Sequence, residues 1–294
     1  MFSLTYKNQE KLKLREVKGL SIVKVNFFSE SLMRTVNFLA IVPIDKRSVD
    51  GNMLRGKEPF KALYLLHGVY GSEYDWITNT RIRQWAQDWN LSVFMPAGEN
   101  KFYNDIESSH DLFGKFIGEE LVNFTRTMFR LSEKREDTYV AGLSMGGLGS
   151  LLTGLRYPHT FSHVGAFSSA LVTDRYPKDN SSSSAIQKRS LFEYVCGAEM
   201  DYAGSRNDYF FLAENIKNSG QPLPKIYMAC GTEDPLLSSN RKYKDYLKRL
   251  GYELEYYEGP GGHEWGFWDQ QIYRFLQTLP LEERSQSLSS GHII

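Results

Sequence analysis

Only two cysteines, Cys196 and Cys230, occur among the 294 residues of this sequence. Two cysteines cannot build the disulfide framework on which small secreted domains depend, and we expect both to be reduced thiols packed as small hydrophobic side chains. Net charge is also missing, because 35 lysine and arginine residues balance 35 aspartate and glutamate residues. The chain therefore has no long-range positive field to attract nucleic acid or anionic lipid, and we expect neither as a partner.

Long hydrophobic runs are absent as well. The most apolar stretches, such as Val36–Ile44, are far shorter than the roughly 18 residues that a membrane-spanning helix needs. The first residues, MFSLTYKNQEKLKLREVKG, do not combine a basic segment with the apolar core of a secretory leader. The sequence therefore predicts a soluble protein without a membrane segment, located in the cytoplasm.

The sequence does contain enough apolar material for a sizeable core, since 41% of its residues are hydrophobic and 14% are aromatic. This composition excludes disorder as the dominant state. Near the N-terminus, the β-rich runs Leu20–Phe28 and Met33–Val42 predict an antiparallel hairpin at the edge of a sheet. A polar loop over about 45–59 follows.

From Lys61 onward, short apolar runs alternate with longer amphipathic segments. Apolar runs without polar alternation are typical of strands buried on both faces, so they predict a mostly parallel sheet flanked by helices. Helices are expected at 76–89, 111–131, 146–157, 240–250 and 267–279. In the second of these, apolar residues at three- and four-residue steps predict one buried stripe. The stripe consists of Leu112, Phe116, Ile117, Leu121, Phe124, Met128 and Phe129.

About fifty residues between this sheet's later strands carry no strand signal, and we interpret 173–222 as a small cap over the carboxyl ends of the strands. A separate domain is the less favoured interpretation. Residues 1–280 are thus predicted to form a single α/β domain that includes the cap. The polar tail over 281–294 is expected to be mobile.

Gly142-Leu143-Ser144-Met145-Gly146 lies where the predicted strand TYVAG meets a predicted helix. A G-x-S-x-G motif that joins a buried strand directly to a helix forms a tight turn, which raises the serine hydroxyl above the sheet edge. Glycines flank such a turn because it has no room for side chains. We therefore predict Ser144 as a nucleophile.

A serine hydroxyl needs a base to remove its proton. Among the six histidines, His263 follows the last predicted strand and precedes the last predicted helix, so its loop can reach the sheet edge. We predict His263 as the base. Surface, capping or loop positions are expected for the other histidines, which are His67, His110, His159, His163 and His292.

The imidazole needs an acidic partner that fixes its tautomer and stabilises its charged form. Glu233 and Asp234 both follow the strand KIYMA, and the order serine, acid, histidine is that of the α/β-hydrolase triad. We prefer Asp234, because a short side chain beside Pro235 can be held rigidly, but the sequence leaves Glu233 as an alternative.

Negative charge on a substrate carbonyl oxygen requires backbone N–H donors, each contributing roughly 3 kcal/mol. The residue after the nucleophile, Met145, is expected to supply one donor. The loop His67–Gly71 is expected to supply the second, with Val69 as the preferred residue.

No cofactor or metal is expected. Gly51–Lys57 matches most of a phosphate-binding loop, but Glu58 replaces the Mg²⁺-binding Ser or Thr and no strand precedes it. His263-Glu264 lacks the second histidine of a zinc helix.

These residues resemble the "putative esterase" branch of the α/β-hydrolases, which includes esterase D (S-formylglutathione hydrolase), feruloyl and acetylxylan esterases, antigen 85 mycolyltransferases and tributyrin esterases. The likeness is carried by LYLLHGVYGSEYDW, MPAGENKFYND, FIGEELVNF, KREDTYVAGLSMGGLGSL, FSHVGAFSSAL, CGTEDPLL and GGHEWGFWD. It implies an α/β-hydrolase fold, a triad of Ser144, Asp234 and His263, and oxyanion donors at Val69 and Met145. The loop at His67–Gly71 lacks the pattern typical of esterase D, which argues against S-formylglutathione.

The hypothesis is a serine carboxylesterase acting on a small-molecule ester with a short acyl group. Alternatives are a feruloyl or acetylxylan-type esterase, an S-formylglutathione hydrolase, an acyltransferase and a non-catalytic binding protein. Resemblance also implies association into a homo-oligomer. Aromatic side chains that could contact a substrate are Tyr70, Trp76, Tyr103, Trp265 and Trp268.

Overall fold

The computed structural model describes residues 16–17, 20–44, 47–48, 58–171, 179–183, 188–196 and 203–281. Most of the predicted loop over 45–59, including Gly51–Lys57, lies outside these residues. Three short stretches of the predicted cap over 173–222 and the tail from residue 282 also lie outside them. His292 and the side chain of Cys196 also lie outside the description. Cys230 is a buried free thiol, as the sequence predicts.

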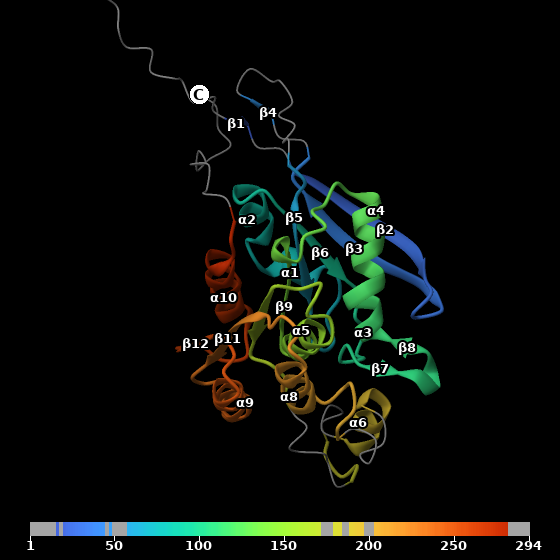
Figure 1. Cartoon of the computed structure of the whole chain (residues 1–294), viewed down its shortest axis with the longest axis vertical. Helices are drawn as coiled ribbons and strands as arrows, with labels where there is room; N and C mark the ends of the chain where they lie inside the picture. The colour runs from blue at the N-terminus through green and yellow to red at the C-terminus, as the bar shows by residue number, and fades with distance from the viewer. Residues whose placement is uncertain are drawn as a thin grey trace, which may run out of the picture.

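One mixed sheet dominates the described part of the chain (Figure 1). Six neighbouring strands are parallel, β3 pairs antiparallel with β6, and β2 pairs antiparallel with β3 at the sheet edge. The predicted parallel sheet and N-terminal hairpin are therefore confirmed. In spatial order the eight strands are β12 (Leu254–Gly259), β11 (Lys225–Gly231), β10 (His163–Phe167), β9 (Thr138–Leu143), β5 (Lys61–Leu66), β6 (Leu91–Pro96), β3 (Arg34–Val42) and β2 (Ser21–Ser29).

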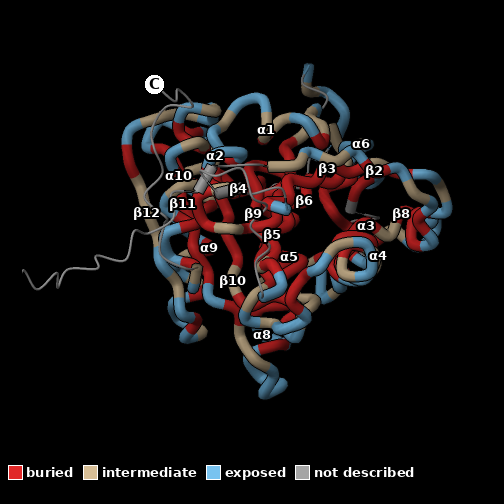
Figure 2. The backbone as a smooth tube through the Cα atoms, turned by 90° about the horizontal axis from the view of Figure 1, so that it is seen from above, coloured by how far each residue is buried: buried red, intermediate tan, exposed pale blue. Residues whose placement is uncertain are grey.

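Two apolar cores lie on the two faces of this sheet, because the central strands are buried on both sides. One core packs against α1 (Asp75–Asn79), α2 (Ile82–Asp88) and α10 (Trp265–Thr278). The other core packs against helices that include α5 (Met145–Arg156) and α9 (Leu237–Arg249). Figure 2 shows the result: buried backbone in the centre and exposed backbone at the periphery.

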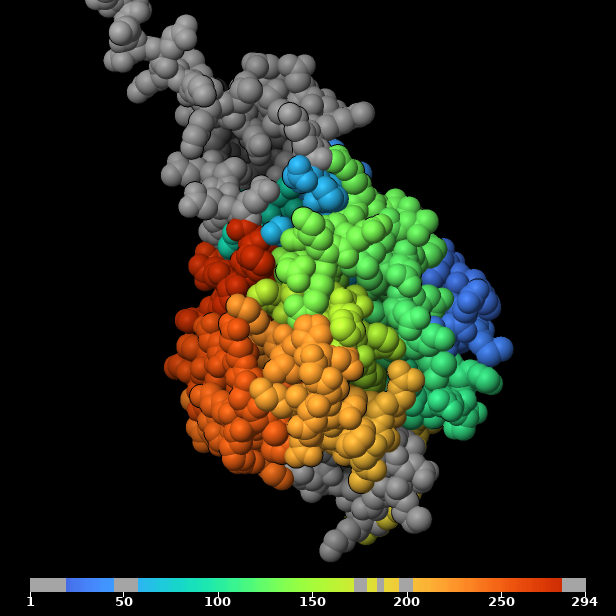
Figure 3. All heavy atoms as spheres, viewed as in Figure 1, coloured from blue at the N-terminus to red at the C-terminus, as the bar shows by residue number. Residues whose placement is uncertain are grey.

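The remaining described elements lie outside the main sheet. Further helices are α3 (Phe113–Lys115), a π-helical turn (Phe116–Glu120), α4 (Leu121–Met128), α6 (Arg189–Cys196) and α8 (Tyr209–Ser219), with 3₁₀ turns at Glu107–Ser109 and Arg135–Asp137. Two short antiparallel pairs are β1 (Glu16–Val17) with β4 (Arg47–Ser48), and β7 (Asp105–Ile106) with β8 (Asp111–Leu112). Figure 3 shows α8 and α9, in orange, forming a continuous surface.

Two predicted helices differ in detail. The segment over 76–89 forms two short helices, α1 and α2, rather than one. The segment over 111–131 is helical only from Phe113 to Met128, and Met128 is 50% exposed rather than part of a buried stripe. Met128 is the last residue of α4, and the end of that helix lies among exposed and half-buried neighbours rather than over the core. None of the described helices is both long and apolar enough to cross a membrane.

Candidate active site

Ser144 occupies the turn between β9 and α5 at the carboxyl edge of the sheet. Its backbone has φ 54° and ψ −116°, a conformation that is costly for a residue with a side chain. A Cβ atom at Gly142 would lie 2.3 Å from the Gly146 carbonyl oxygen, and one at Gly146 would lie 2.3 Å from the Leu66 carbonyl oxygen. The two glycines are therefore required because the turn passes this close to neighbouring backbone.

His263 reaches Ser144 from the loop between β12 and α10. Its Nε2 atom lies 3.0 Å from Ser144 Oγ, and its Nδ1 atom lies 2.9 Å from Asp234 Oδ2. A carboxylate only accepts hydrogen bonds, so Nδ1 carries the proton and Nε2 accepts from the serine hydroxyl. The imidazole is thus placed to remove the Ser144 proton.

Asp234 follows β11 and has a fully buried side chain. Burial by itself would raise the pKa of this carboxyl, but hydrogen bonds from His263, the Leu236 amide and Ser168 outweigh burial and lower the pKa. The Leu236 amide donates to Oδ1 at 2.8 Å, which leaves Oδ2 for His263. Asp234 therefore remains a carboxylate facing the imidazole.

Glu233, the alternative acid, points elsewhere. Its Oε2 atom accepts a hydrogen bond of 2.6 Å from the Gly261 amide, and its Oε1 atom accepts one from the Thr232 hydroxyl. The first of these hydrogen bonds lowers the pKa of Glu233 most. Glu233 thus holds the loop that carries His263, while Asp234 contacts the imidazole.

The two predicted oxyanion donors lie beside the serine. Met145 is the first residue of α5, so its amide has no acceptor in a preceding helical turn. The Val69 amide makes no hydrogen bond to any residue in the described ranges. Gly68, next to Val69, approaches Ser144 so closely that a Cβ there would lie 3.5 Å from the Ser144 Cβ. The described part of the chain thus shows two backbone donors next to this contact, Met145 directly after Ser144 and Val69 directly after Gly68.

His67 supports the loop that contains Val69. The Gly98 amide donates to its Nε2 atom at 2.8 Å, so its Nδ1 atom donates to the Gly68 carbonyl at 2.7 Å. Burial lowers the pKa of His67, which keeps the ring neutral and able to accept from Gly98. The loop role expected for His67 matches these contacts.

Asn100 was not singled out by the sequence, yet it contacts the same loop. Its Oδ1 atom accepts a hydrogen bond of 2.7 Å from the Tyr70 amide, at a residue whose φ is 64°. Tyr103 adds a hydrogen bond from its hydroxyl to the His67 carbonyl. The only hint in the sequence is position, because 98–103 follows a buried strand and so lies at the same sheet edge.

The predicted substrate-contacting aromatic residues divide into two groups. Tyr70 is 69% exposed, and Trp265 is half-buried beside a shallow hollow of about 330 Å³ between α1 and α10. Trp268, Trp76 and Tyr103 are buried. Trp268 packs edge to face on His263 with ring centroids 4.9 Å apart, and the Trp76 indole donates to the Leu66 carbonyl. The three buried rings therefore pack behind the site, inside the protein, and do not line its surface.

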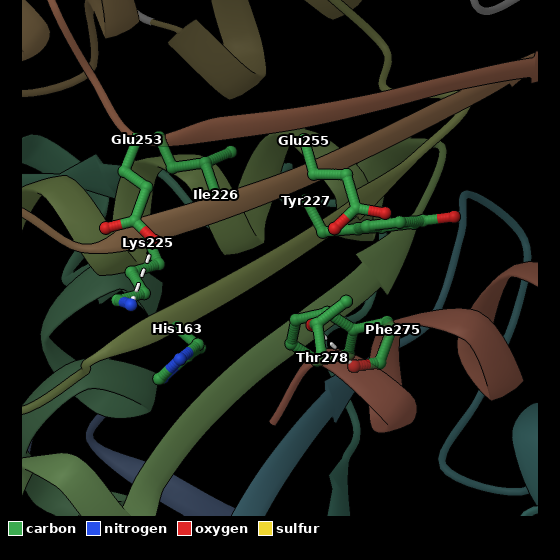
Figure 4. Close-up of a pocket in the computed structure, with 8 residues that line it drawn as sticks. All are labelled: His163, Lys225, Ile226, Tyr227, Glu253, Glu255, Phe275 and Thr278. Carbon is green, nitrogen blue, oxygen red and sulfur yellow. Dashed lines mark hydrogen bonds and ion pairs between the residues drawn. The ribbon is translucent and has the colours of Figure 1, made fainter. Parts of the chain in front are cut away.

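A separate cleft of about 310 Å³ lies at the amino ends of the strands, at the opposite end of the sheet from Ser144 (Figure 4). His163 and Lys225 begin β10 and β11, whereas Ser144 follows the end of β9. Burial and the nearby Lys225 and Arg135 lower the pKa of His163 to about 4, so its ring is neutral at physiological pH. His110 and His159 are exposed. Among the described residues no cluster of His, Cys, Asp and Glu could hold a metal ion.

Comparison with known proteins relates this chain to esterases. The family described as "Putative esterase" matches residues 46–279. An acetyl esterase from Caldicellulosiruptor saccharolyticus is 39% identical over 263 residues, which cover 88% of this chain and 98% of that relative.

Solved structures agree with this match. The fluorophosphonate-binding serine hydrolase F of Staphylococcus aureus superposes with a TM-score of 0.77 at 25% identity, covering 88% of this chain and 98% of that one. An S-formylglutathione hydrolase of Staphylococcus aureus gives a TM-score of 0.75 at 25% identity, covering 89% and 99%. A ferulic acid esterase has a TM-score of 0.66 at 20% identity, which is a likeness of fold.

Proposed function

The chain belongs to the "putative esterase" family of α/β-hydrolase fold and is a carboxylic ester hydrolase, and from this premise we propose that it hydrolyses short-chain acyl esters through a Ser144–His263–Asp234 triad. The observation that carries the proposal is the continuous chain of hydrogen bonds from Ser144 Oγ through the imidazole to Asp234. Nucleophile, base and orienting acid are the three groups that such catalysis requires.

In the first half of the reaction, Ser144 Oγ attacks the ester carbonyl carbon while His263 Nε2 takes the hydroxyl proton. Asp234 stabilises the imidazolium that forms, and the Met145 and Val69 amides hold the negatively charged oxygen. As the tetrahedral intermediate collapses, the bond to the alcohol oxygen breaks and the imidazolium protonates that oxygen. The acyl group remains on Ser144.

In the second half, a water molecule attacks the acyl-enzyme. His263 removes one proton from the water and returns it to Ser144 Oγ, which leaves with the bonding electrons. The products are the carboxylic acid and free enzyme, and no cofactor is consumed. The second half therefore uses the same residues as the first, with water in place of the serine hydroxyl as the attacking group.

A short acyl group is supported by the likeness to an acetyl esterase at 39% identity. Exposed Tyr70 and half-buried Trp265 supply aromatic surface for the rest of the substrate. A feruloyl or acetylxylan-type activity is the alternative within the same chemistry, and the choice of alcohol and acyl group separates the two.

The test compares p-nitrophenyl acetate, butyrate and octanoate with methyl ferulate, using wild type and Ser144→Ala. We expect turnover of the short esters and a loss of at least about a thousandfold in the variant. Preferential turnover of methyl ferulate would establish the alternative. Full activity of folded Ser144→Ala would refute the mechanism.

We also propose that residues 1–280 form one domain in which 173–222 caps the carboxyl edge of the sheet. A cytoplasmic location is proposed as well, and fractionation of the source cells tests it. Association into a homo-oligomer is part of the same proposal, and light scattering of the purified chain tests it.

A further inference from the structure

Ser168 directly follows β10 and lies next to the turn that carries Ser144. It is fully buried and has a φ of 46°, an uncommon conformation for a residue with a side chain. Its amide donates to the Ala229 carbonyl at 2.7 Å. Backbone held in a costly conformation persists where its surroundings require it, and such positions cluster at functional sites.

The segment around Ser168 touches both the nucleophile and the acid-bearing loop. The Ser144 amide donates to the Phe167 carbonyl, and the Ala170 amide donates to the Ser144 carbonyl, each at 2.9 Å. The Asn240 side chain on α9, the helix after Asp234, accepts from the Ser169 amide and donates to the Ser169 carbonyl. A rigid backbone therefore fixes where the Ser168 side chain lies.

The Ser168 hydroxyl accepts a hydrogen bond of 3.1 Å from the Trp268 indole Nε1. Since the indole only donates, the hydroxyl proton is free to be donated elsewhere. The Ser168 side chain also lies near Asp234, and its presence favours the charged form of that carboxyl.

Trp268 completes the arrangement. Its ring lies edge to face on His263, with ring centroids 4.9 Å apart and planes at 89°. The hydrogen bond to Ser168 fixes the rotation of the indole, and the indole in turn limits where the imidazole can lie. One buried hydroxyl thus holds the aromatic support of the base.

We propose that Ser168 is a positioning residue of the active site, whose hydroxyl holds the Trp268 indole and, through that ring, orients His263. The inference rests on the proposed function. Ser168 touches neither substrate nor the reacting atoms, so its contribution is to hold the Asp234–His263 pair in the geometry in which Nε2 meets Ser144 Oγ.

The experiment measures the pH dependence of kcat and KM for p-nitrophenyl acetate with Ser168→Ala. We expect kcat to fall on the order of ten- to a hundredfold with KM nearly unchanged, because the imidazole loses the support that the fixed Trp268 ring gives it.

The neighbouring residue supplies a matched control. Ser169 is equally buried, but its hydroxyl has no hydrogen-bond partner among the described residues. Ser169→Ala removes the same atom one position away and is expected to leave kcat and the pH profile unchanged. Equal effects of the two substitutions would overturn the proposal.

Two further variants separate the hydroxyl from the backbone. Ser168→Gly also lacks the hydroxyl but accepts the left-handed conformation, so we expect it to fold and to match Ser168→Ala in kcat. Trp268→Phe keeps an aromatic ring but replaces the indole by a smaller phenyl group without an N–H, and combined with Ser168→Ala it is expected to lose less than the product of the single losses. Wild-type kcat and pH profile in folded Ser168→Gly would refute the role of the hydroxyl.

The Ser144→Ala variant distinguishes failure of the Ser168 inference from failure of the proposed function. If Ser144→Ala is inactive while Ser168→Ala behaves as wild type, the inference about Ser168 fails and the proposed function stands. If Ser144→Ala is fully active, the proposed function fails and the Ser168 proposal fails with it.

Discussion

The Oε2 atom of Glu233 accepts a hydrogen bond of 2.6 Å from the Gly261 amide, so the carboxylate next to Asp234 holds the loop that delivers His263. The neighbouring carboxylates of Glu233 and Asp234 thus contact different parts of the site. Asp234 is buried against the imidazole, and exposed Glu233 ties the end of β11 to the loop after β12.

Asp234→Asn and Glu233→Gln form a matched pair of charge removals. An amide at Asp234 no longer selects the productive imidazole tautomer, so we expect kcat to fall by roughly 10³–10⁴. Glu233→Gln keeps an acceptor for Gly261, and we expect a loss of less than about tenfold. Steady-state kinetics on p-nitrophenyl acetate measures both, and comparable losses in the two variants would contradict the assignment of Asp234.

Gly146→Ala places a methyl group 2.3 Å from the Leu66 carbonyl oxygen. The main chain cannot move away cheaply, so we expect the free energy of unfolding to fall by about 1–3 kcal/mol, together with a loss of esterase activity. Urea unfolding measures the first effect. Gly266→Ala is the control, because nothing lies within 4 Å of its added atom, and wild-type stability of Gly146→Ala would contradict the described turn.

Asn100→Ala leaves the Tyr70 amide without its acceptor. The loop that presents the Val69 amide then loses one of its supports, and we expect kcat to fall about tenfold while the melting temperature changes little. Glu99→Gln changes the preceding side chain, which pairs with Arg34 rather than with this loop, and should retain kcat. If Asn100→Ala raises only KM, the residue serves substrate binding instead.

His163 links stability to pH through its pKa of about 4 in the folded chain. The unfolded chain binds a proton near the ordinary histidine pKa of about 6.5, while the folded chain does not, so this residue lowers stability as pH falls from about 6.5 to 4. Above that window it has no effect. We expect His163→Gln to weaken the pH dependence of urea unfolding between pH 7 and 4.5, by about 1–2 kcal/mol after allowance for partial exposure. If the free energy of unfolding changes equally with pH in wild type and His163→Gln, the lowered pKa of His163 is contradicted.

Local patterns predicted the strands well because each buried strand is an uninterrupted apolar run bounded by turns. Helix details were harder. The π-helical turn at Phe116–Glu120 leaves no periodic signature that distinguishes it from an α-helix. Periodicity also does not show where a helix runs past the core, so Met128, at the end of α4, was placed in the buried stripe although it faces solvent. The break between α1 and α2 was missed for a similar reason, because apolar residues continue on both sides of it.

The sequence by itself determined the parallel sheet, the N-terminal hairpin and the tight turn at Ser144, because these follow from runs of neighbouring residues and from glycine sterics. It also placed Asp234 and His263 at strand ends that meet at one edge. Only the tertiary structure decided which of two adjacent acids meets the imidazole, and that Asn100 and Ser168 lie beside the site. Contacts between side chains far apart in sequence depend on the rotamers and loop paths that packing selects, and no local pattern encodes them.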